Sequence, residues 1–395
     1  MRKIISTMSA IILIVCFVTF LTAGMLTTIL SEKAKFSYYE NRELAKFPKY
    51  SEKALIDGTY TSEIENWLKD FAAWREPLLH IHTIADMNFL KRPVVNDIVI
   101  SKDVLLPWKD FEDIDEQSIN LLAEMMGDRL RSHTEVTANN GGKFYYVAIP
   151  CQYICFADEY PSYMNNRSKY TDLSKTAFFK KLDEKNVNYI DILQHYETCG
   201  GAENFSSKVD NHFNIQGAYI TYLAIMQEVK KYYPDIDILE EGDYETEELP
   251  NPYIGSRGRA LFGLADSKEK MSIIKPLKEI PFERINNGFE GSPIVYQMPE
   301  TKTENILYSL YMSGDFGQTQ IDTNRRELPS ILVYGDSFTN GVESLIWYSF
   351  DKMESLDFRH YNKMSLEEYI KEMKPEIVVC IRDYEAMLLP EFNGQ

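Results

Sequence analysis

The sequence predicts an α/β fold with a parallel sheet, preceded by one N-terminal transmembrane helix. Two observations support this prediction. Short apolar runs typical of buried strands alternate with amphipathic helical segments along most of the chain, and this alternation favours a parallel sheet. The chain also opens with a long apolar run. Hydrophobic residues make up 44% of the sequence and aromatic residues 13%, so a sizeable core is expected and wholesale disorder is not.

The opening apolar run follows Arg2 and Lys3. Residues 4–30 contain no Asp, Glu, Lys, Arg or His, and the run is longer than the roughly 20 residues that a helix needs to cross a bilayer. A cleaved secretory signal peptide is the alternative, but the run exceeds a typical signal-peptide core and no clear cleavage site closes it. We expect an uncleaved signal anchor over residues 1–31. Because a long following domain is translocated largely regardless of flanking charge, the rest of the chain is expected outside the cytoplasm.

The overall charge argues against a nucleic-acid partner. The chain has 42 Lys and Arg against 60 Asp and Glu, a formal net charge of −18, so a phosphate backbone would be repelled. No clustered cations offset this charge.

The cysteines indicate neither a zinc module nor a disulfide. Outside the apolar run they are Cys151, Cys155, Cys199 and Cys380, without paired CxxC elements. If residues 151–155 are extended, the first two Cα atoms lie roughly 13 Å apart, too far for a disulfide. We expect four free thiols, and we expect no metal and no cofactor.

The remaining elements follow from apolar spacing and turn residues. After a polar stem over residues 32–59, a domain over residues 60–395 is expected, with a polar, turn-rich insertion or second lobe at about 235–328. The expected elements are helices over 60–90 and 115–135, a strand at Phe144–Ile149, a helix over 169–185, a strand at Val187–Ile190, a helix over 214–232, a strand at Ser330–Tyr334, a helix over 365–373 and a strand at Glu376–Ile381.

Gly335, Asp336 and Ser337 directly follow one of these predicted strands. A serine placed there lies at the carboxyl edge of a parallel sheet, where α/β folds build their sites. The glycine permits a tight turn, and backbone N–H groups after the strand can stabilise an oxyanion. The alternative is an ordinary strand-to-helix turn in which Asp336 or Ser337 caps the helix.

A serine nucleophile needs a base, and Asp210-x-His212 is the most suitable of the histidine neighbourhoods. The pair follows a polar loop and precedes the helix predicted from residue 214. A neighbouring carboxylate can orient an imidazole, as the third member of a triad does. The alternative is a capping turn in which Asp210 or Asn214 caps that helix and His212 is merely exposed.

Five blocks of the chain resemble bacterial DHHW proteins, which belong with the alginate O-acetyltransferase-like branch of the SGNH-hydrolase superfamily. No block is specific alone, but the five occur in the family's order between residues 38 and 381. They are ENRELAKFP from Glu40, DFAAWREPL from Asp70, YVAIP from Tyr146 with Tyr160-Pro161, DNHFNIQGAY from Asp210, and GDSF from Gly335.

The resemblance implies Ser337 as nucleophile, His212 as base and Asp210 as orienter. Asn211 and Phe213 stand where the name-giving motif has His and Trp, and Cys151-Gln152 replaces a polar-Lys pair. No clean glycine or asparagine block for the oxyanion is present. The candidate substrate or oxyanion residues are Gly335, Asp336, Asn340, Arg382 and Tyr384, and Tyr253, Arg257 and residues 311–315 are candidates for an acceptor groove or for core packing.

The resemblance further implies a three-layer, SGNH-hydrolase-like fold and an O-acetyltransferase of the bacterial cell envelope. The acceptor would be a cell-surface or secreted polysaccharide. Because acetyl-CoA is not available outside the cytoplasm, the implied donor is a multi-pass membrane acyltransferase. Two alternatives remain: a carbohydrate acetylesterase with the same catalytic residues, and a non-catalytic glycan-binding protein.

Overall fold

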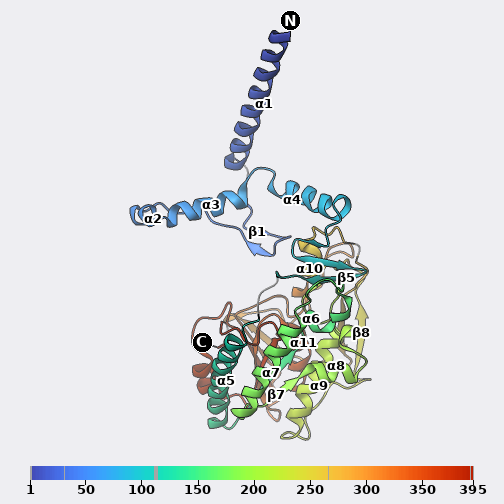
Figure 1. Ribbon diagram of the computed structural model, residues 1–395. Helices are drawn as coiled ribbons and strands as arrows, with labels where there is room; N and C mark the ends of the chain where they lie inside the picture. Colours follow the sequence, from blue (N-terminus) through green and yellow to red (C-terminus); the bar gives the residue numbers. More distant parts are fainter. Residues whose placement is uncertain (1, 31, 111–113, 266, 392, 395) are drawn as a thin grey trace. The chain divides into compact units, whose positions relative to one another are not determined.

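The computed structural model describes residues 2–30, 32–110, 114–265, 267–391 and 393–394 (Figure 1). The chain forms two compact units. One comprises Met1–Asn96 with Arg259–Ala265, and the other comprises Asp97–Gly258 with Asp266–Gln395. The first unit therefore extends well beyond the predicted stem.

The first unit begins with the helix α1, Arg2–Leu30. Its segment Ala10–Leu30 has a mean hydropathy of 2.5 and is long and apolar enough to cross a membrane, as the sequence predicted. The other elements are β1 (Phe36–Ser37), β2 (Arg42–Glu43), α2 (Glu52–Ile56), α3 (Thr59–Phe71), α4 (Arg75–Ile84), the π-helical turn η1 (Ala85–Phe89) and β3 (Val94–Val95).

The predicted helix over 60–90 is broken between α3 and α4. Trp74 takes a left-handed backbone conformation with φ 60°, and ion pairs hold both sides of the break. Asp70 accepts a hydrogen bond from Arg42 at 2.9 Å, and Arg75 donates to Glu40 at 2.8 Å. The hydrogen bonds from Arg42 lower the pKa of the Asp70 carboxyl. The first two resemblance blocks thus meet in one charged cluster, which sets the break that periodicity alone did not reveal.

The second unit is built on an eight-stranded sheet in the order β11-β10-β12-β14-β13-β15-β6-β7. The five strands from β14 to β7 are parallel, and β10, β11 and β12 form an antiparallel edge. The strands are β6 (Lys143–Ile149), β7 (Tyr189–Asp191), β10 (Glu283–Asn286), β11 (Phe289–Glu290), β12 (Gln318–Asp322), β13 (Ser330–Gly335), β14 (Lys352–Asp357) and β15 (Ile377–Asp383).

Helices cover both faces of this sheet. Right-handed crossovers between parallel strands place α7 and α12 on one face and α11 on the other. Helix α5 packs with the first pair, α9 packs with α11, and α8 packs with α9. The longer helices are α5 (Glu116–Asn139), α7 (Ser168–Glu184), α8 (Ile192–Thr198), α9 (Ile215–Lys230), α11 (Phe338–Ile346) and α12 (Leu366–Met373). The predicted three-layer α/β architecture is confirmed.

Short elements complete the second unit. They are the hairpin β4 (Ile98–Ser101) and β5 (Val104–Pro107), the hairpin β8 (Tyr244–Glu248) and β9 (Ser272–Pro276), and the helical turns α6 (Gln152–Cys155), η2 (Ala157–Glu159), η3 (Ala202–Asn204), η4 (Tyr308–Leu310) and η5 (Trp347–Ser349). The helical turn α10 (Gly255–Ala260) begins in the second unit, and its last two residues belong to the first.

The core lies around the central parallel strands, where β15 is buried along its whole length and β6 and β13 are buried except for one end residue each.

The predicted strands and most predicted helices lie within a few residues of the observed ones. Part of the stretch over 235–328 extends the central sheet as β10, β11 and β12, so that part is not a separate lobe. Cys151 caps the helical turn α6 and Cys155 is its last residue, so the two do not lie on an extended segment, and the five cysteines are free thiols.

Candidate active site

The turn after β13 presents Ser337 at the carboxyl edge of the parallel strands. Gly335 ends β13 in register with Ile381 of β15, and a Cβ on Gly335 would lie 2.1 Å from the Ile381 carbonyl oxygen. Only glycine permits this close approach. Asp336 then accepts a hydrogen bond from the Phe338 N–H at 3.0 Å, and α11 begins directly after the serine.

Two hydrogen bonds join the three predicted triad residues. His212 Nε2 lies 2.8 Å from Ser337 Oγ, and His212 Nδ1 lies 2.5 Å from Asp210 Oδ1. An ionised carboxylate only accepts, so Nδ1 carries the proton and Nε2 accepts from the serine hydroxyl. Asp210 and His212 are buried, and Ser337 is half-buried. The fold brings these residues together although His212 and Ser337 are 125 positions apart.

The Asp210 carboxyl is held ionised. Burial opposes ionisation, but the adjacent His212 and hydrogen bonds from His212 and Ser256 outweigh burial and lower the pKa of Asp210. The Ser256 N–H donates to Asp210 Oδ2 at 2.6 Å. The carboxylate therefore has partners on both oxygens, which orients it towards the imidazole.

A turn from the predicted insertion clamps the Asp210 loop. Gly255 has φ 68°, and a Cβ there would lie 2.2 Å from the Val209 carbonyl oxygen. This contact sets the Ser256 N–H against Asp210. From the other side, Gln152 Nε2 donates to the Asp210 carbonyl oxygen at 2.7 Å and also to the Ser207 carbonyl oxygen. Gln152, to which the sequence assigned no contact, positions this loop.

A half-buried acid, Glu269, supports the same loop. Glu269 accepts hydrogen bonds from Ser207 Oγ at 3.0 Å and from the Lys208 N–H at 2.8 Å. Ser207 Oγ in turn accepts from the Asp210 N–H at 3.0 Å. Burial raises the pKa of Glu269 to about 7.

Aromatic rings enclose the imidazole. His212 stacks on Tyr308 with the ring centroids 3.7 Å apart, and Phe338 lies 4.8 Å away. Phe213, at the tryptophan position of the DHHW motif, packs edge-on against Phe338. Tyr308 and Phe213 also line a cavity of about 170 Å³, together with Tyr253, Tyr311, Glu269 and seven further residues. The predicted groove candidates Tyr253 and Tyr311 are thus buried walls of this cavity.

The other predicted site residues have structural partners. Asn340 Nδ2 donates to Asp315 at 2.6 Å. Arg382 is buried, with its Nη1 donating to the Leu389 carbonyl oxygen at 3.1 Å, and the buried Tyr384 hydroxyl donates to Asp191. Gly335 and Asp336 shape the serine turn. The groove candidate Arg257 is half-buried and donates from Nε to Gln152 at 3.2 Å.

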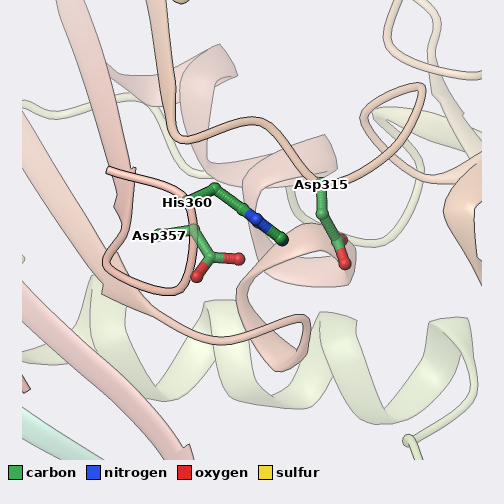
Figure 2. Close-up of side chains that lie close together, drawn as sticks. All are labelled: Asp315, Asp357 and His360. Carbon is green, nitrogen blue, oxygen red and sulfur yellow. The ribbon is translucent and has the colours of Figure 1, made fainter. Parts of the chain in front are cut away.

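A second polar cluster lies at the carboxyl end of β14. Ligand atoms of Asp315, Asp357 and His360 lie within 4.8 Å of one another, and Figure 2 shows the imidazole between the two carboxylates. Carboxylates and imidazole are metal ligands, but Arg359 already bridges the acids, at 3.2 Å to Asp315 and 2.5 Å to Asp357. The cluster is therefore an ion-pair network in which the Arg359 guanidinium supplies the cation.

Solved structures share this fold. PatB1 of Bacillus cereus, in a structure with a sulfonyl adduct, is 19% identical and superposes with a TM-score of 0.63 over 75% of this chain and 97% of that chain. A DHHW family protein from Eubacterium siraeum is 16% identical, with a TM-score of 0.57 over 76% and 95% of the two chains. The chain has the fold of a DHHW family protein. This fold agrees with the resemblance seen in the five sequence blocks.

Other comparisons are weaker or negative. The O-acetyltransferase domain of Pseudomonas putida AlgJ is 14% identical, with a TM-score of 0.46 over 74% of this chain and 92% of that chain. No protein-family model matches the chain, and no curated protein matches it.

Proposed function

We propose that this protein is an extracytoplasmic O-acetyltransferase that transfers an acetyl group to a hydroxyl of a bacterial cell-surface or secreted polysaccharide. The observation that carries the proposal is the hydrogen-bonded chain from Asp210 through His212 to Ser337 at the carboxyl edge of the sheet. Such a chain supplies a nucleophile, a base and an orienting carboxylate. The sulfonyl adduct in PatB1 supports a nucleophilic side chain on this fold, because sulfonyl reagents react with nucleophiles.

The first half-reaction loads the serine. Ser337 Oγ attacks the carbonyl carbon of the acetyl donor while His212 Nε2 takes the hydroxyl proton. The bond between the acetyl carbon and the donor's leaving oxygen then breaks, and His212 returns the proton to that oxygen. Asp210 stays ionised throughout and stabilises the imidazolium, in keeping with its lowered pKa.

The second half-reaction unloads the serine. A sugar hydroxyl attacks the acetyl-serine, His212 takes its proton, and the proton passes to Ser337 Oγ as the serine ester bond breaks. The Ser337 N–H, at the start of α11, is our candidate oxyanion donor, because N–H groups in the first turn of a helix lack intrahelical partners.

The acetyl donor follows from the expected topology. We infer that Ala10–Leu30 anchors the chain in the membrane and that the site faces away from the cytoplasm. Acetyl-CoA is then out of reach, so we propose a multi-pass membrane acyltransferase as the partner that delivers the acetyl group. If water replaced the sugar hydroxyl, the same residues would make the protein an acetylesterase.

Mass spectrometry of surface glycans tests the proposal. We would compare a wild-type strain, a deletion strain, and deletion strains complemented with wild type, Ser337→Ala or the exposed control Ser292→Ala. A transferase predicts that acetylated glycan disappears in the deletion and Ser337→Ala strains and returns with Ser292→Ala. Accumulation of acetylated glycan in the Ser337→Ala strain would indicate the esterase. Identical glycans in all strains would overturn both enzymatic functions.

A further inference from the structure

Helix α4 carries an apolar stripe on its exposed side. Trp74, which precedes the helix, Leu78 and Ile81 are 43%, 56% and 60% exposed. They follow one another at steps of four and three residues, so they share one helix face. The opposite side packs within the first unit, where Thr83 is fully buried and accepts a hydrogen bond from Asn96 at 3.0 Å.

The stripe begins against the apolar helix α1. The Trp74 ring stacks on Phe20 with centroids 5.6 Å apart, and a Cβ on Gly24 would lie 3.7 Å from the same ring. The neighbouring Ala73 N–H donates to Thr28 Oγ1 at 2.9 Å. Phe20, Gly24 and Thr28 all lie within the apolar segment Ala10–Leu30. Wherever that part of α1 contacts lipid, Trp74 contacts it too.

The contacts place α4 at the end of the apolar segment. Thr28 precedes Leu30 by two residues, about 3 Å of helix rise, whereas the Trp74 ring reaches back towards Phe20. In Figure 1, α4 lies below the C-terminal end of α1 and extends away from it to the right, so it does not run alongside α1. An amphipathic helix in this position lies in the membrane plane with its apolar face sunk about 5–10 Å into the leaflet.

The surrounding residues are typical of a membrane–water interface. Lys33, just past the apolar segment, places its ammonium 5.1 Å from the Trp67 ring centroid and 5.2 Å from the Phe71 ring centroid. Tryptophan and lysine are the side chains that anchor spans at this level. Phe89 and Leu90, 80% and 61% exposed, continue the apolar surface beyond α4.

We propose that α4 is an in-plane membrane helix whose stripe of Trp74, Leu78 and Ile81 inserts among the lipids beside the C-terminal end of α1. The occupant is lipid and not a protein, because the stripe is continuous with α1, whose large apolar side chains from Ile11 to Ile29 are exposed. The inference rests on the anchor in the proposed function, and it concerns the first unit alone.

Depth-dependent quenching tests the inference on the full chain in phosphatidylcholine liposomes. In a Cys16→Ala, Cys199→Ser background, single cysteines at Leu78 or Ile81 would carry a polarity-sensitive fluorophore. The matched control is Glu76→Cys, which is exposed on a different face of the same helix. We expect doxyl-labelled phosphatidylcholine to quench the first two probes at least threefold more than the control probe. Aqueous iodide should show the opposite order.

Three outcomes would count against the inference in distinguishable ways. Equal iodide quenching at all three positions would overturn the in-plane helix. If the probes at Leu78 and Ile81 are shielded from iodide in native membranes but not in liposomes, a membrane protein and not lipid covers the stripe. If alkaline carbonate extracts the wild-type chain from the membrane, α1 is not a membrane anchor and the proposed topology fails. If the chain stays in the membrane but the probes at Leu78 and Ile81 are exposed to water, only the α4 inference fails. Without added cysteines, Trp74→Phe should lower the doxyl-lipid quenching of tryptophan emission.

Discussion

The imidazole of His212 lies flat against the ring of Tyr308, with the centroids 3.7 Å apart and the planes inclined by 4°. Tyr308 begins the turn η4, in a stretch of chain that has weak periodicity and no catalytic motif. The stack restricts rotation of the imidazole about its long axis. It thus holds Nε2 in the plane in which it meets Ser337 Oγ at 2.8 Å.

The first prediction concerns this stack. Tyr308→Ala should lower kcat for acetyl-ester turnover by about tenfold, because about 1 kcal/mol of aromatic contact is lost and the imidazole gains freedom. Tyr308→Phe keeps the ring and should stay within about twofold of wild type. Steady-state kinetics with p-nitrophenyl acetate measure both. Equal loss in the two variants would show that the hydroxyl matters and the stack does not.

The second prediction concerns the proposed triad. Ser337→Ala and His212→Ala should each reduce turnover by roughly 10³-fold or more, because triad members act as a unit. Asp210→Asn should cost somewhat less, since that side chain does not touch substrate. A sulfonyl fluoride should label Ser337 in wild type, and tandem mass spectrometry of the labelled peptide would locate the adduct. In the control Ser292→Ala, the sulfonyl fluoride should label Ser337 as it does in wild type. Undiminished turnover in a folded Ser337→Ala variant would end the serine mechanism.

The sequence was sufficient to predict the three side chains that hydrogen bonds join, Asp210, His212 and Ser337, but not the groups that hold them. Ser337 follows a clear apolar strand, and Asp210-x-His212 is a recognisable spacing. The Ser256 N–H is a backbone group, so the identity of its residue carries no signal. Tyr308 belongs to a stretch whose fold depends on tertiary contacts. Tyr384 is a predicted site residue because it lies at the end of a predicted strand. Its hydroxyl donates a hydrogen bond to Asp191, and that bond has no signal in the local sequence.

The break in the predicted helix over 60–90 has a similar cause. Apolar spacing runs through the segment, but Asp70 and Arg75 pair with side chains more than 25 positions away. Long-range ion pairs of this kind leave no local pattern. They became visible only when the fold brought the two resemblance blocks together.

The third prediction concerns the pH dependence of stability. The pKa of Glu269 is about 7 in the folded chain against 4.5 for an ordinary glutamate, so the folded state binds this proton more tightly. The stability that Glu269 contributes is therefore present below about pH 4.5 and is lost as the pH rises through 7. The loss amounts to at most about 3 kcal/mol.

Glu269→Gln should remove this dependence. Between pH 5 and pH 8, the free energy of unfolding of wild type should fall relative to that of the variant. Other titrating groups cancel in the difference. Urea unfolding, followed by tryptophan fluorescence, measures the free energy of unfolding at each pH. The exposed control Glu279→Gln should show the same pH dependence of this free energy as wild type. Parallel curves for wild type and Glu269→Gln would contradict the prediction.

The fourth prediction concerns the turn that clamps the Asp210 loop. Gly255→Ala introduces a Cβ 2.2 Å from the Val209 carbonyl oxygen at a backbone φ of 68°, so the turn must move and the Ser256 N–H must leave the Asp210 carboxylate.

Gly288→Ala is the matched control, because its φ is 86° but its Cβ would meet nothing within 4 Å. The control should lose about 1–2 kcal/mol of unfolding free energy from backbone strain alone, with normal turnover. Gly255→Ala should lose at least about 1 kcal/mol more and reduce kcat at least tenfold with little change in KM, because the misplaced carboxylate no longer orients His212. Urea unfolding and ester kinetics on both variants provide the comparison. If Gly255→Ala matched Gly288→Ala in both measurements, the turn would have no part in positioning the triad.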